Sequence, residues 1–321
     1  MNSENIDRVL ELAPDETQTA PDDNSRAAVF AALLWLAFLI ALKLIAPFLP
    51  VNSRAAAIGL GAIFIVAYSV GAIGLASRLM QIRFSLVARI GVLVGLVAAW
   101  WFLSQMLAPQ FAAFGGLSNP TTAQLLMHEI GRAGVDISLL LAAMFLGSLV
   151  AQIFSAPNVL GPLCAFCLML DVWFVLFGGI ASQIAEKAPR YAEKVTASVP
   201  AVGAATTSQF ALPSSAIGAA DYLLLGLVFA AMHRFAMNWR ESARWMWVLV
   251  SGALLAVGLG IGMLPGFVFI ALATLIPNWK FFQFTREERF ALLYAGGFVV
   301  LLTIGLHFAT PYLVEQMKTV K

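Results

Sequence analysis

Two aspartates, Asp171 and Asp221, stand inside long apolar stretches of a chain that keeps nearly every other charge out of such stretches. A carboxylate in the hydrocarbon core of a bilayer costs about 3 kcal/mol even on lenient insertion scales, so acids there usually serve a function. Two carboxyl groups in one low-dielectric site cannot both ionise cheaply, and the pair holds one proton between them over a wide pH range. In that state one carboxylate takes a proton from water while its protonated partner polarises a carbonyl. The two residues therefore predict hydrolytic acid–base chemistry.

The elements that carry the two acids must be helices that lie side by side. Asp171 falls in the apolar segment 157–182, and Asp221 falls in the next one, 213–236. Asp171 lies about 11 residues before the end of its segment and Asp221 about 8 residues after the start of its own, which is roughly 16 and 12 Å of helix. Consecutive membrane helices run in opposite directions, so we expect the two carboxyl groups at similar depth, where they meet if the helices pack together.

The composition sets the fold class. The chain has 321 residues, of which 61% are hydrophobic and 11% charged, and its mean hydropathy is +0.88. These values exclude a soluble globular domain. Apolar runs of about 20 residues, the length that crosses a hydrocarbon core, recur along the chain. We therefore predict an all-α polytopic membrane bundle of about nine transmembrane segments, or eight if the short segment 264–278 is re-entrant. The segments are 27–49, 54–79, 84–108, 132–154, 157–182, 213–236, 244–262, 264–278 and 289–312.

The chain divides into four parts by composition. Residues 1–26 are acidic and polar and are expected to be disordered. Residues 27–154 form a predicted N-terminal part with four membrane helices. Residues 155–280 form the predicted catalytic membrane part that contains both aspartates. Residues 281–321 comprise the last transmembrane helix and a C-terminal tail.

Arginine and lysine predict the orientation, because short loops rich in these residues face the cytoplasm. Basic clusters at 78–89, 234–244 and 280–289 fall on one side of a nine-span chain, together with the N-terminus. We expect a multi-pass integral protein of a prokaryotic-type inner (plasma) membrane, with a cytoplasmic N-terminus. Lys43 lies near the end of the first span, where its ammonium group is expected to reach the interface. The basic residues form no single stripe, so nucleic acid is not an expected partner.

Small residues precede the second aspartate. Gly218, Ala219 and Ala220 would let another backbone approach the carboxyl group of Asp221 closely. A second motif, Leu264-Pro265-Gly266, comes two helices later. With Asp171 one helix earlier, the chain resembles the GxGD intramembrane aspartyl proteases, presenilin and its prokaryotic homologues above all.

The resemblance implies a catalytic pair and a binding cavity for transmembrane protein or peptide substrates. It implies no metal and no organic cofactor, and the bilayer is the other expected partner; the oligomeric state is unknown. The catalytic residues would be Asp171 and Asp221, and the substrate-binding residues Gly218, Ala219, Ala220, Leu264, Pro265 and Gly266.

The chain departs from the family pattern at several positions. Ala220 stands where the motif has its second glycine, and Leu170 stands where presenilins have tyrosine before the first aspartate. Gly266 follows Pro265 where the family has Ala-Leu. Four predicted spans precede the helix of Asp171, whereas the family has five. The predicted placement of the loop between the aspartates outside the cell matches signal peptide peptidase rather than presenilin.

Other readings of the chemistry-bearing residues remain. A proton- or cation-coupled transporter would use the same two buried aspartates. Cys164 and Cys167 form a C-x-x-C one turn before Asp171, but redox enzymes with this motif usually need a second pair, so buried apolar thiols are favoured. His128 and Glu129 begin an H-E-x-x sequence in which arginine occupies the fifth position, so the zinc motif of metalloproteases fails.

Overall fold

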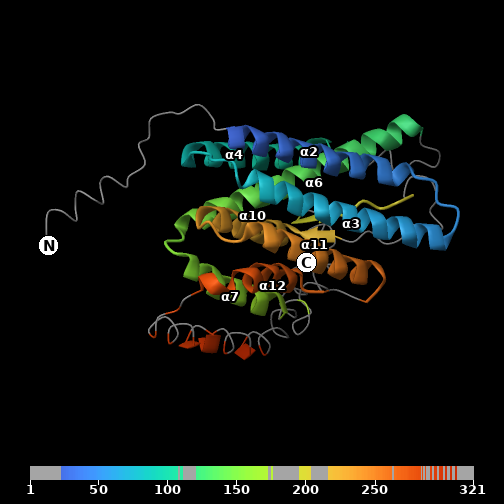
Figure 1. Ribbon diagram of the computed structural model, residues 1–321. Helices are drawn as coiled ribbons and strands as arrows, with labels where there is room; N and C mark the ends of the chain where they lie inside the picture. Colours follow the sequence, from blue (N-terminus) through green and yellow to red (C-terminus); the bar gives the residue numbers. More distant parts are fainter. Residues whose placement is uncertain are drawn as a thin grey trace.

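The computed structural model describes residues 23–107, 109–110, 121–172, 175, 195–203, 216–261 and 264–282, and individual residues from 284 to 308. These residues are mostly helical, and the helices lie roughly side by side (Figure 1). Short turns η1 (Ala46–Phe48), η2 (Leu103–Leu107), η3 (Ala151–Ile153), η4 (Pro157–Val159) and η6 (Trp279–Phe281) adjoin the helices. The helices are α2 (Asp23–Ile45), α3 (Arg54–Leu79), α4 (Leu86–Phe102), α6 (Thr122–Val150), α7 (Leu160–Val172), α10 (Ala219–Arg234), α11 (Trp239–Gly258) and α12 (Gly266–Asn278).

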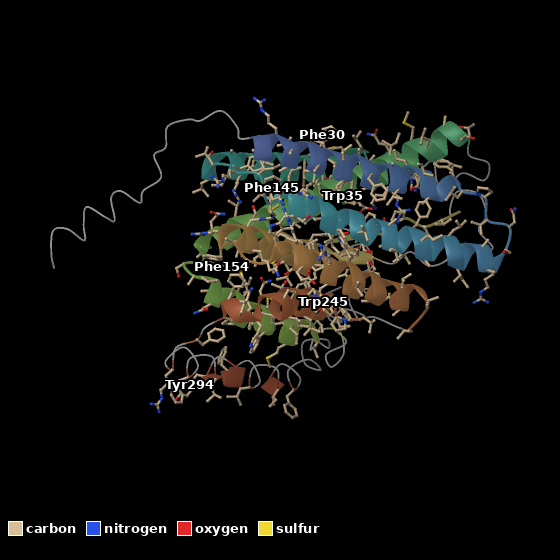
Figure 2. The ribbon with its side chains drawn as sticks, in the orientation of Figure 1. Phe30, Trp35, Phe145, Phe154, Trp245 and Tyr294 are labelled. Carbon is tan, nitrogen blue, oxygen red and sulfur yellow. The ribbon has the colours of Figure 1, made fainter. Side chains whose placement is uncertain are left out.

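Four of the helical stretches are long and apolar enough to cross a membrane: Ser25–Phe48, Arg54–Leu79, Leu86–Leu107 and Thr122–Ile153. Their outward surfaces are apolar as well. α4 buries none of its residues in the bundle, and Phe30 of α2 projects from the outside of the bundle in Figure 2. Soluble proteins rarely expose continuous apolar surface of this kind. The four helices indicate a membrane protein.

Several helix boundaries differ from the predicted ones. α3 coincides with segment 54–79, but α6 begins at Thr122 rather than at 132, so residues 122–131, which fall between two predicted segments, are helical. The early start has a local cause, because Thr121 and Gln124 form a capping box. α11 begins at Trp239 rather than at 244. α2 begins at Asp23, inside the tail predicted to be disordered; residues 1–22 of that tail lie outside the described residues.

The later helices are shorter. α12 has 13 residues, about 20 Å of helix, which is less than the roughly 30 Å thickness of a hydrocarbon core. α7 and α12 are apolar but fall below the length of the four long stretches. The end of segment 157–182 lies largely outside the described residues, and segment 289–312 is described only at single positions.

Two short strands correct the purely helical prediction. β1 (Thr196–Ser198) pairs antiparallel with β2 (Ala216–Gly218), in the register Thr196 with Gly218 and Ser198 with Ala216. β2 occupies the start of the segment 213–236, which was predicted to be helical throughout. Gly218 is extended and ends the strand, and α10 begins at the next residue. The strand therefore leads directly into the helix that carries Asp221.

Helix α10 is held tightly against α6 at the centre of the bundle. A Cβ atom on Gly147 of α6 would overlap the backbone of α10 at Leu223, and one on Gly226 would overlap the backbone of α6 at Met144. Close backbone approach through small residues is the usual way in which membrane helices pack. Most of α10 is buried, including Phe229, whose side chain is fully enclosed. This contact fixes the position of the helix behind Asp221.

Candidate functional site

Asp171 lies near the end of the described part of α7 and contacts the start of α12. Its Oδ2 accepts a hydrogen bond of 2.7 Å from the backbone N–H of Phe267. Phe267 is the second residue of α12, after Gly266, and its N–H is one of those that a helix leaves unpaired at its start. α12 packs along α7, which brings this N–H to the carboxylate. The side chain of Asp171 is half-buried.

Asp221 lies in the first turn of α10 and also contacts the start of α12, at Gly266. Its Oδ2 accepts the backbone N–H of Gly218 at 3.1 Å, which caps the start of its own helix. Its Oδ1 lies so close to Gly266 that a Cβ atom there would overlap it, and the Cγ would lie 3.1 Å from that Cβ. Only glycine fits at position 266 while the carboxyl group keeps this position.

The two carboxyl groups therefore converge on consecutive residues, Gly266 and Phe267. Backbone bond lengths keep a Cβ and the following amide nitrogen within about 4 Å, so the nearest oxygens of Asp171 and Asp221 are at most about 9 Å apart. Negative charges on both carboxyl groups would repel each other. Each carboxyl group has one backbone N–H donor and keeps its Oδ1 without a hydrogen bond from the described residues. Both groups could therefore hold water or a proton.

The other predicted substrate-binding residues surround this point. Pro265 is buried and precedes the first helical residue of α12, and Leu264 is half-buried. Gly218 and Ala219 are half-buried beside the carboxyl group of Asp221, whereas Ala220 is exposed. The structure thus brings the second sequence motif and both aspartates together. Their roles in substrate binding remain predictions.

A second buried charged cluster was missed in the sequence. Lys43 of α2 donates to Asp136 Oδ2 of α6 at 2.5 Å, and the two side chains are 5% and 11% exposed. The prediction that Lys43 reaches the interface is therefore wrong. Asp136 is a third acid inside the bundle, which the sequence analysis did not distinguish because it falls near the start of the predicted segment 132–154.

Ser198 joins this cluster to the strands. Its backbone N–H and hydroxyl group donate to Asp136 Oδ2 at 3.3 and 2.6 Å, and its carbonyl oxygen accepts from Lys43 Nζ at 2.5 Å. Because Ser198 is the last residue of β1, the ion pair anchors the strand that pairs with β2. A chain of contacts therefore runs from the Lys43–Asp136 pair through β1 and β2 to Gly218, whose N–H binds Asp221.

Two buried tyrosines connect the same two regions by a second route. The hydroxyl oxygens of Tyr68 in α3 and Tyr222 in α10 are 3.3 Å apart. Tyr222 follows Asp221 directly, and the Lys43 ammonium lies 5.3 Å from the ring centroid of Tyr68. No sequence pattern predicted this pair, because tyrosine in a membrane helix usually indicates an interface.

The remaining chemistry-bearing residues are the two cysteines and the His128–Glu129 pair. Cys164 is buried, Cys167 is half-buried, and both thiols are free. His128 Nε2 and Glu129 Oε1 are 4.0 Å apart in the first half of α6. Within the part of the chain that the structure describes, no three His, Cys, Asp or Glu side chains gather into a group that could hold a metal.

Comparisons with protein-family models, with curated proteins and with solved structures found no match for this chain.

Proposed function

We propose that this protein is an intramembrane aspartic protease that hydrolyses peptide bonds of membrane-embedded substrates with Asp171 and Asp221. The observation that carries the proposal is the convergence of both carboxyl groups on Gly266 and Phe267 at the start of α12. The two residues come from different helices, and packing rather than sequence adjacency brings them together. The proposed reaction requires the two carboxyl groups to share one proton, as adjacent acids in a low-dielectric site do.

The reaction would proceed by general acid–base catalysis with one ionised and one protonated carboxyl group. The carboxylate removes a proton from water, the resulting oxygen nucleophile attacks the peptide carbonyl, and the protonated partner gives its proton to the carbonyl oxygen. The tetrahedral diol then collapses: the ionised carboxylate takes a proton from one diol hydroxyl, the C–N bond breaks, and the protonated carboxyl group gives its proton to the leaving amine, which returns the pair to its starting state. The partial positive charge at the start of α12 stabilises the single negative charge of the pair. Either aspartate can take either role.

The surroundings suit an extended substrate. Pairing with β1 occupies one edge of β2, and within the described residues the sheet has only these two strands. A peptide that added to the other edge of β2 would run toward Asp221, since Gly218 ends the strand. Ala220, which precedes Asp221, is exposed and carries only a methyl group.

The proposal includes a topology of nine membrane crossings with the N-terminus in the cytoplasm. The four long apolar helices support the membrane location, and the shorter α7, α10 and α12 would cross as tilted or partial helices in a hydrated interior. Reporter fusions after α3, after α6 and after α10 test this orientation. Nine crossings place all three fusion points in the cytoplasm.

The decisive experiment measures cleavage of a helical reporter substrate by the purified full chain in proteoliposomes. Asp171→Asn and Asp221→Asn keep an oxygen that accepts the backbone N–H but cannot ionise. We expect each to abolish cleavage while the thermal unfolding temperature stays close to that of the wild type. Glu241→Gln, which alters an exposed carboxylate of α11, serves as the matched control and should leave cleavage unchanged. If cleavage persists after either aspartate substitution, the protease proposal is wrong.

A proton- or cation-coupled transporter is the second candidate. The buried Lys43–Asp136 pair and the Tyr68–Tyr222 contact favour it, because ionisable and hydroxyl groups inside a bundle are typical of ion pathways. Proteoliposomes with a pH-sensitive dye inside distinguish the two functions. Proton or cation uptake that needs both aspartates, without cleavage of any reporter, would replace the protease proposal.

A further inference from the structure

A pocket of about 450 Å³ opens where α3, α6 and α10 end and α4 begins. These helix ends lie on the left of Figure 1. Neither aspartate lines it, and Asp221 lies in the first turn of α10, whereas the pocket lies at the other end of that helix. Buried Met80, Ile82 and Ala230 form part of its wall. The polar residues that line it are Gln81, Arg83, Arg89, Gln152, His233 and Arg234.

The pocket gathers positive charge from distant parts of the chain. Arg83 follows α3, Arg89 lies in the first turn of α4, and Arg234 ends α10. None of the residues that line the pocket is acidic. The ion pairs found among the described residues involve none of these arginines. The guanidinium groups therefore face the pocket without a carboxylate that neutralises them in this part of the chain.

Backbone carbonyls hold two of these arginines in place. Arg234 Nη1 donates to the carbonyl oxygens of Ala151 and Gln152 at 3.1 and 2.6 Å. Arg89 Nε donates to the carbonyl oxygen of Phe84 at 3.3 Å. These bonds position each side chain but use one nitrogen each, so the other guanidinium nitrogens remain for a ligand. Arg83 is exposed and has no partner among the described residues.

We propose that this pocket binds a phosphate group, carried either by an anionic phospholipid or by a soluble phosphate ester. Guanidinium groups recognise phosphate through paired, charge-assisted hydrogen bonds, and several of them around one pocket match its charge and its oxygens. The volume lies within the range of small-molecule sites. The pocket also lies at the ends of α3 and α6, which are long and apolar enough to cross a membrane, and basic pockets between membrane helices bind acidic lipids. The site is independent of the proposed proteolysis.

The test uses the delipidated full chain in a neutral detergent and measures its thermal unfolding temperature. One series adds phosphatidylglycerol, and another adds inorganic phosphate with chloride as the ionic-strength control. Arg83→Gln and Arg89→Gln are the test variants. Arg240→Gln is the matched control, because this exposed arginine lies near the same end of the bundle, over the ring of Trp239, and does not line the pocket.

We expect at least one anion to raise the unfolding temperature of the wild type in a saturable way. Each test variant should raise the half-saturating concentration at least about tenfold, the loss expected for one charge-assisted hydrogen bond. Arg240→Gln should leave it within about twofold. Stabilisation by phosphatidylglycerol alone would identify a lipid headgroup, whereas stabilisation by inorganic phosphate would identify a soluble ester. No stabilisation by either anion, or an equal loss in Arg240→Gln, would overturn the proposal.

Discussion

The buried Lys43–Asp136 pair gives the sharpest stability prediction. Asp136→Ala removes the carboxylate but leaves the ammonium of Lys43 buried, with only the carbonyl oxygen and hydroxyl group of Ser198 nearby. Breaking a buried pair by removing one partner costs about 3–5 kcal/mol, because a charge is left without compensation. Because Lys43 keeps its hydrogen bond to the Ser198 carbonyl oxygen, we expect the free energy of unfolding to fall by about 3 kcal/mol, at the lower end of this range.

Replacement of both partners should restore most of this stability. Lys43→Met with Asp136→Leu removes both charges and keeps similar volumes, so we expect the double variant to unfold within about 1–2 kcal/mol of the wild type. The corresponding double-mutant cycle should give a coupling of about 2 kcal/mol or more. Glu241→Ala is the control, because it breaks the exposed pair with Arg244 and should cost less than about 1 kcal/mol.

Reversible unfolding in mixed detergent micelles, followed by tryptophan fluorescence, measures these free energies. The reasoning requires that Asp136→Ala be much less stable than Glu241→Ala. If the two variants lose similar stability, the Lys43–Asp136 pair does not behave as a buried ion pair. If the double variant is as unstable as the sum of the single ones, the charges do not compensate each other.

Three further substitutions and one control test the packing around the aspartates. Gly266→Ala places a Cβ on Asp221 Oδ1, so it should abolish reporter cleavage, whereas Gly252→Ala in open space should leave cleavage intact and stabilise α11 by up to about 1 kcal/mol. Gly147→Ala forces α6 and α10 apart and should cost about 1–3 kcal/mol in the micelle unfolding assay. Tyr222→Phe removes the contact with the Tyr68 hydroxyl and should cost about 1 kcal/mol in the same assay, and no loss would show that this contact does not stabilise the fold.

Much of the helical frame could be predicted from local sequence. α3 lies at 54–79 as expected, because a membrane helix must satisfy its backbone within one continuous apolar segment. Other boundaries followed local chemistry that a hydropathy pattern does not contain. The capping box at Thr121 starts α6 early in a polar stretch, and the extended backbone at Gly218 delays α10. The strands β1 and β2 are too short to leave a periodic pattern.

The sequence by itself determined that this is an apolar, helical membrane chain with two costly carboxyl groups on consecutive predicted helices. It also indicated that a glycine-containing motif two helices later belongs near them. Only the tertiary structure decided that Gly266 contacts Asp221 and that Phe267 binds Asp171. The physical reason is that hydropathy indicates whether a segment is more stable in lipid or in water. The partner of a buried charge depends instead on which helices pack together.

The ion pair shows the same limit most clearly. Lys43 and Asp136 are 93 residues apart, and each alone looks like a charge near the end of a span. Their burial is tolerable only because α2, α6 and β1 bring an ammonium, a carboxylate and the polar groups of Ser198 to one point. The contacts that offset the cost of burying these charges depend on the tertiary structure and cannot be predicted from local composition.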